Sequence, residues 1–149
     1  MATTIEANLA GVSTQVHKAC IRAGRDAHPR LVAVSKRQPG ERIAAALQAG
    51  QRIFGENRVQ EAQQRWQERR QTYNDLRLHL IGGLQTNKAA EAVALFDVIE
   101  VVDRPKLARA LAVEMQKAGR HPECYIQVNT GEEPQKSGVM PDDLDALLA

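Results

Sequence analysis

The chain has 149 residues, of which 43% are hydrophobic and 26% charged, a make-up typical of one soluble globular domain with a real core. The net charge of +2 is too small to favour nucleic acid or an acidic membrane surface as a partner. No apolar run approaches the roughly 20 residues of a membrane span, and the N-terminus lacks the regions of a signal peptide, so we expect a cytoplasmic protein.

Strands and helices are predicted to alternate along the whole chain. Apolar residues recur at helical spacing over residues 4–25, and a short β-branched run over residues 31–36 is the first strand. Pro39 opens the next helix and Gly50 closes it. Further on, the sequence predicts strands over residues 52–57, 78–84, 98–102 and 124–129, and helices over residues 58–73, 87–95, 105–117 and 141–149.

This alternation predicts a single α/β domain over residues 1–149, with a parallel sheet built from right-handed βαβ units. Two features favour a (β/α) TIM-barrel-type fold over an open doubly wound sheet. The first strand is not followed by Gly-x-Gly-x-x-Gly. Polar residues also stand at the carboxyl ends of several predicted strands, namely Lys36, Asn57, Gln85, Asp103 and Asn129.

Lys36 ends the first predicted strand and is the first candidate for chemistry. Because side chains alternate along a strand, Val32, Val34 and Lys36 share one face, which puts an amine in line with two core valines. A partly dry lysine at the ligand-binding end of a parallel sheet can attack a carbonyl and form a Schiff base. The alternative is that Lys36 simply begins a loop, with its ammonium group in water.

Three further candidates follow or lie within the next two strands. Asn57 is suited to orienting a ring or hydroxyl of a ligand, to capping the following helix, or to both. Gly82 and Gly83 indicate either a close approach of backbone to a ligand or a tight strand exit. His79 is more typical of a hydrogen-bonded core residue than of a catalyst.

Lys136 lies in the polar loop after the fifth predicted strand. One interpretation is a second amine that faces the same mouth as Lys36, where its charge helps to keep Lys36 neutral or holds an anion. The other is an ordinary lysine on a flexible loop.

The remaining patterns point to no metal or nucleic-acid site. Cys20 and Cys124 match no metal or redox spacing and are predicted to be reduced, buried thiols. The histidines show no ligand spacing, so no metal is expected. Glutamates interleave with the arginines of the helix over residues 58–73, which predicts a solvated face for Arg58, Arg65, Arg69 and Arg70.

Five segments together resemble one family closely: residues 33–39, 54–57, 79–88, 102–104 and 127–138. It is the pyridoxal phosphate homeostasis protein family, which is related to the N-terminal barrel domain of alanine racemase. The resemblance covers nearly the whole chain in order. It implies that Lys36 carries pyridoxal 5′-phosphate as a Schiff base and that Asn57 and Lys136 line the cofactor pocket.

The same resemblance implies a chain that is truncated at its C-terminus. Family members are eight-stranded barrels, and the strands predicted here correspond to the first five. In the family, the later segments hold the cofactor phosphate. Their loss is expected to weaken cofactor binding by several kcal/mol, since charge-assisted hydrogen bonds are worth roughly 1.5–3 kcal/mol each.

The resemblance leaves three functions open. The first is a non-catalytic protein that buffers or delivers pyridoxal phosphate, with the apoenzymes that use this cofactor as partners. The second is an amino-acid racemase, which needs two positioned proton-transfer groups; Tyr73 and Tyr125 fall in a helix tail and a strand and do not supply the second. The third is an inactive fragment that keeps only the fold.

Overall fold

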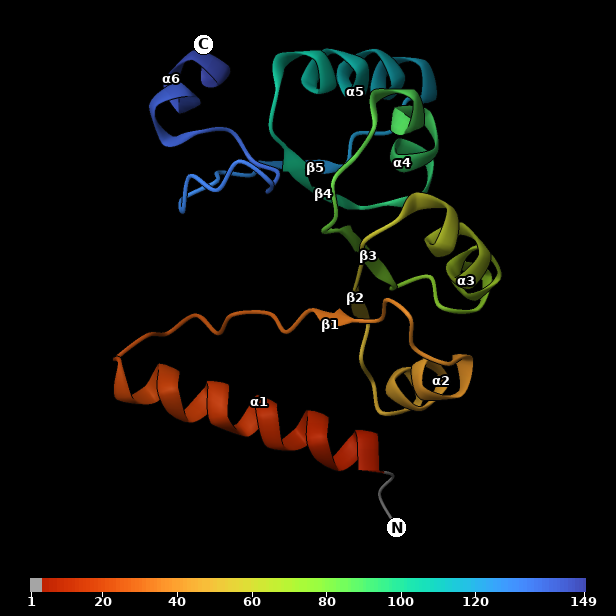
Figure 1. Ribbon diagram of the computed structural model, residues 1–149. Helices are drawn as coiled ribbons and strands as arrows, with labels where there is room; N and C mark the ends of the chain where they lie inside the picture. Colours follow the sequence, from red (N-terminus) through yellow and green to blue (C-terminus); the bar gives the residue numbers. More distant parts are fainter. Residues whose placement is uncertain (1–3) are drawn as a thin grey trace.

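The computed structural model describes residues 4–149, in which five strands alternate with helices along the chain (Figure 1). The strands are β1 (Ala33–Val34), β2 (Ile53–Glu56), β3 (Arg77–Leu80), β4 (Val98–Val102) and β5 (Glu123–Ile126). The helices are α1 (Thr4–Arg22), α2 (Gly40–Gln48), α3 (Val59–Thr72), α4 (Ala89–Leu95), α5 (Pro105–Ala118) and α6 (Leu144–Leu148). Short 3-10 turns, Thr86–Lys88 and Pro141–Asp143, precede α4 and α6. Within this described part of the chain, no helix has the length and apolar character that crossing a membrane requires.

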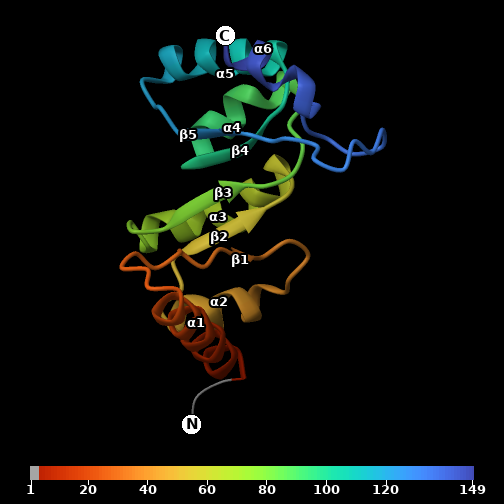
Figure 2. The ribbon, with the colours of Figure 1, turned by 90° about the vertical axis from the view of Figure 1, so that its left-hand side faces the viewer.

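All five strands are parallel, and each lies beside its neighbour in the chain, in the order β1-β2-β3-β4-β5. Helices α2 to α5 lie on one side of this sheet, and Figure 2 views the sheet from the other side. A doubly wound sheet would reverse its strand order and carry helices on both faces. The sequential order is that of an arc of a TIM-type barrel, so the predicted fold class is confirmed, with five strands in the arc.

The hydrophobic core lies between the sheet and helices α2 to α5. Phe54 of β2 and Trp66 of α3 are almost fully buried, and their ring centroids lie 4.6 Å apart. Leu78 and Leu80 of β3 point to the same side of the sheet and are also buried. Aliphatic residues of the outer helices complete the core, among them Ile43, Leu47, Ala62, Val93, Leu107 and Leu111. Burial of this apolar surface holds the helix layer on the sheet.

The first strand corrects one prediction. The two faces alternate as expected, but Val34 is 48% exposed and so is not a core residue. Instead, Ala33 packs against the core and Ser35 is buried. The reason is that the core of this chain fills the helix side of the sheet, whereas Val34 points to the opposite side.

Several strands are also shorter than predicted. The first covers two residues rather than residues 31–36, and β3 ends at Leu80 rather than at residue 84. The strand over residues 124–129 is β5, which ends at Ile126 and is followed only by an isolated parallel bridge between Val128 and Val139. The residues beyond the strands form loops at their carboxyl ends, where the candidate side chains lie.

The cysteine prediction holds for one residue of the two. Both thiols are free, and Cys20 is buried, but Cys124 is exposed. Cys124 lies on β5, which pairs with β4 alone among the described strands and is therefore open on its outer side. Its sulfur is still desolvated enough to raise the pKa of the Cys124 thiol above its ordinary value.

Candidate functional site

A cavity of about 800 Å³ lies at the carboxyl ends of β1, β2 and β3. Its wall is formed by the loops that leave these three strands and by the first two turns of α3. Both the position and the size are typical of ligand sites in parallel α/β proteins. Two of the three predicted site residues, Lys36 and Asn57, line this cavity.

Lys36 lies in the turn that leaves β1. The amide of Gln38 donates a hydrogen bond of 3.1 Å to the carbonyl of Ser35, and this bond closes the turn around Lys36. Lys36 is exposed rather than partly dry, and within residues 4–149 its amine makes no ion pair or hydrogen bond. The amine is thus free to react with a ligand that enters the cavity.

Asn57 lines the same cavity and is half-buried. The alternative that it caps the next helix is wrong, because Arg58 occupies the N-cap position of α3 and no side chain makes a capping hydrogen bond there. The amide side chain of Asn57 therefore remains available to a ligand.

The two glycines after β3 have different roles. A Cβ atom at Gly82 would lie 2.3 Å from the carbonyl oxygen of Asn57, so Gly82 allows the exits of β2 and β3 to pass close together. Gly83 lines the cavity itself. The strand-exit interpretation thus applies to Gly82, whereas the approach of a ligand to Gly83 stays a prediction.

Replacing Gly82 by alanine is expected to lower the free energy of unfolding by about 1–3 kcal/mol, the usual range for overpacking. The reason is that the new methyl group meets backbone atoms of Asn57, which cannot move independently of β2. Urea denaturation measures the change. Gly11→Ala is the matched control, since a Cβ there meets no atom within 4 Å and lies inside α1. Equal stability of the two variants would contradict this account of Gly82.

Lys136 lies in a neighbouring hollow of about 320 Å³ rather than in the cavity of Lys36. The two hollows share Gly83 in their walls. Lys136 is exposed, and its amine lies 3.0 Å from a carboxylate oxygen of Glu133 in the same loop. The structure therefore brings Lys136 next to the candidate site and gives its charge a partner.

His79 is held by a carboxylate and does not line either hollow. Its Nδ1 lies 2.5 Å from Oε1 of Glu100 on β4, and its side chain is 13% exposed. It points away from Leu78 and Leu80, toward the helix-free side of the sheet. The predicted hydrogen bond is confirmed, but His79 is only half-buried and lies outside the core, because the core fills the opposite, helix-covered side of the sheet.

Other cavity residues carry charge. Arg37, Arg58 and Lys88 all contribute to the wall. Glu61 also lines the cavity, but positive charge predominates, so the cavity is suited to an anionic ligand. Lys88 pairs with Glu91 at 3.1 Å. A backbone hydrogen bond and, second, Lys88 lower the pKa of the Glu91 carboxyl.

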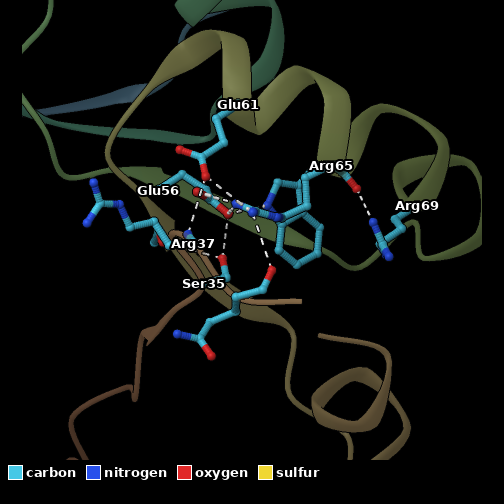
Figure 3. A network of polar contacts seen from close by, with 9 residues as sticks. Ser35, Arg37, Glu56, Glu61, Arg65 and Arg69 are labelled. Atoms are coloured by element: carbon cyan, nitrogen blue, oxygen red, sulfur yellow. Dashed lines mark hydrogen bonds and ion pairs between the residues drawn. The ribbon is translucent and has the colours of Figure 1, made fainter. Parts of the chain in front are cut away.

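Beneath the cavity lies a buried carboxylate that we did not predict from the sequence. Glu56 is 0% exposed and accepts hydrogen bonds from Ser35 Oγ at 2.7 Å and Trp66 Nε1 at 2.9 Å (Figure 3). Nη1 of Arg65 lies 2.9 and 3.0 Å from its two oxygens. These hydrogen bonds and the guanidinium group offset the loss of hydration that burial imposes on the carboxylate.

This pair corrects the prediction of a solvated arginine face on α3. The side chain of Arg65 is only 15% exposed because its guanidinium group forms an ion pair with the buried carboxylate of Glu56. Arg70 binds Asp97, which also pairs with Arg120 at 2.8 Å. One signal for the buried pair was present in the sequence: Glu56 alternates with Phe54 and so shares its core-facing side.

The sequence model of the family described as "Alanine racemase, N-terminal domain" matches residues 8–149. The chain is 38% identical over 142 residues to the pyridoxal phosphate homeostasis protein of Pasteurella multocida. It is 41% identical over 149 residues to the protein of that name from Pseudomonas aeruginosa. These alignments cover 95% and 97% of the chain but 61% and 63% of the relatives, so the chain spans about three fifths of their length.

Solved structures also match nearly the whole of this chain. PipY of Synechococcus elongatus, solved without PLP, superposes with a TM-score of 0.84 at 41% identity, covering 97% of this chain and 63% of PipY. PipY with PLP bound gives a TM-score of 0.78 at 40% identity, with 97% and 62% covered. A histidine racemase from Leuconostoc mesenteroides gives 0.68 at 16% identity, covering 97% and 36%, which is a likeness of fold alone.

Proposed function

This chain belongs to the family of the alanine racemase N-terminal domain, and from that premise we propose that it binds pyridoxal 5′-phosphate through Lys36. We propose further that it serves the homeostasis of this cofactor and catalyses no reaction. The observation that carries the proposal is the unpaired amine of Lys36 in the wall of the cavity. The names of its relatives and the PLP bound to PipY support the choice of ligand.

The residues of the cavity fit two parts of the cofactor, its aldehyde and its phosphate group. Lys36 would hold the cofactor through its aldehyde, which would supply an electrophilic carbon for the neutral amine, with the carbonyl oxygen leaving as water. Because Lys36 is exposed, the proton of its ammonium form passes directly to solvent. Arg37 and Arg58 in the same wall favour a ligand with a phosphate group.

Asn57 and Lys136 belong to the same proposal in different ways. Asn57 offers an amide donor and acceptor inside the cavity. Lys136 lies in the adjoining hollow and pairs with Glu133. If an anionic group of a ligand replaced Glu133 as its partner, the charge of Lys136 would bind that ligand. Neither residue is proposed to be catalytic.

The racemase alternative is disfavoured by where the tyrosines lie. Tyr73 follows α3 and stacks under the guanidinium of Arg52, 4.9 Å from the ring centroid. Tyr125 is on β5 and 54% exposed. Neither lines the cavity of Lys36, so neither is positioned to transfer a proton on the face opposite an amine. We therefore propose a carrier in the cytoplasm, with pyridoxal-phosphate-dependent apoenzymes as the recipients.

Borohydride reduction tests the attachment site. The purified chain is incubated with pyridoxal phosphate and reduced, and the label is mapped by peptide mass spectrometry. One label per chain on Lys36 is expected. Labels spread over Lys18, Lys88, Lys106 and Lys117 would mean that no defined site exists, and formation of D-alanine from L-alanine by the loaded chain would mean an enzyme.

A further inference from the structure

The turn that presents Lys36 has an unfavourable backbone conformation. Arg37, the residue after Lys36, has a φ of 60°, in the left-handed region that non-glycine residues seldom adopt. Such a residue keeps this conformation only where the surrounding contacts hold it. The amide of Ser35 is fixed to the carbonyl of Gly55 at 3.0 Å, so the turn begins from a rigid strand.

Two carboxylates of the neighbouring β2–α3 segment hold this turn at its two ends. Before Lys36, the hydroxyl of Ser35 donates to Glu56. After Lys36, the amide of Arg37 donates to Oε1 of Glu61 at 3.3 Å. Figure 3 shows these contacts of Ser35 and Arg37. The side chain of Lys36 takes part in neither of them, so the turn is fixed while the amine stays free.

Arg65 joins the two carboxylates to each other and to the turn. Its Nη1 binds Glu56, whereas its Nη2 lies 3.3 Å from Glu61 and 3.4 Å from the carbonyl of Gln38. Glu56 and Trp66 are both 0% exposed, which anchors this arrangement in the core. We call Glu56, Glu61 and Arg65 the turn clamp.

We propose that Glu61 is a positioning residue for Lys36, acting through the Arg37 amide with the buried Glu56–Arg65 pair as its anchor. The inference rests on the proposed function, in which Lys36 must meet the cofactor aldehyde in the cavity. When Arg37 keeps its left-handed conformation, the Lys36 side chain leaves the turn toward the cavity. When the Arg37 amide loses its acceptor, the turn relaxes and the amine samples more directions.

The test combines two measurements on the same variants. Glu61→Ala is expected to speed hydrogen exchange of the Arg37 amide and to lower borohydride-fixed labelling of Lys36 at limiting pyridoxal phosphate by roughly three- to tenfold, the loss of one hydrogen bond. Glu61→Gln keeps an oxygen acceptor and is expected to restore both readouts. Glu68→Ala removes the same charge from an exposed site on α3 and is expected to change neither.

The only tryptophan of the chain, Trp66, reports on the fold through its emission, which should be the same in all variants. Unchanged Arg37 exchange or unchanged Lys36 labelling in Glu61→Ala would overturn the inference. So would a Glu61→Gln variant that behaves like Glu61→Ala, because the effect would then come from charge in the cavity. If the parent chain labels many lysines equally, the proposed function fails, and the Arg37 exchange alone decides whether the clamp exists.

Discussion

Replacing Arg65 by methionine is expected to cost about 3–5 kcal/mol of unfolding free energy, because it leaves the buried carboxylate of Glu56 without its counter-ion. A domain of this size has only about 5–15 kcal/mol in total. The loss is therefore large enough to leave much of the variant unfolded under mild conditions. Urea denaturation followed by the emission of Trp66 measures it.

A second substitution separates the loss of the ion pair from a general packing defect. The double variant Glu56→Gln/Arg65→Met removes the negative charge as well but keeps an oxygen acceptor for Ser35 and Trp66. Since the uncompensated buried charge is removed, part of the lost stability should return, and the remaining deficit reflects the buried NH2 of the new glutamine, which has no acceptor. A double variant that is as unstable as Arg65→Met would contradict the view that the unpaired charge of Glu56 causes the loss.

Much of the fold is predictable because its signals are local. Helix α5 begins at Pro105 and ends before Gly119, whose φ of 60° is the left-handed conformation of a typical helix stop. The alternation of strands and helices is enough to predict a parallel sheet, and the polar strand ends are enough to favour a barrel arc. These features depend on residues that are close in the sequence.

The exposure of Val34 was not predictable in the same way. A strand of alternating residues has two faces, and its own sequence does not say which one the helices cover. In this chain, the helix side takes Ala33 and Ser35. The face of a barrel strand that points into the barrel is as apolar as a core face, so the sequence predicts Val34 in the core.

The candidate site, too, could be predicted only in part. The positions of Lys36 and Asn57 at the ends of β1 and β2 follow from the order of the elements, so their meeting in one cavity was expected. The separation of Lys136 into an adjoining hollow depends on how the loop after β5 folds. The hydrogen bonds of Asn129 to Glu133 shape that loop, and such contacts have no periodic signal.

Replacing Lys36 by arginine is expected to abolish the borohydride-fixed label at this site while leaving the melting temperature unchanged. The charge is kept, but a guanidinium stays protonated and cannot add to an aldehyde. The substitution should not change the stability of the fold, because Lys36 is exposed and its amine has no partner within residues 4–149. Lys106→Arg is the matched control, since Lys106 is an exposed lysine on α5, away from the cavity, and its loss should leave the Lys36 label intact. A Lys36→Arg chain that still takes up one label per molecule would move the attachment site to another amine, with Lys136 in the adjoining hollow as the first to be mapped.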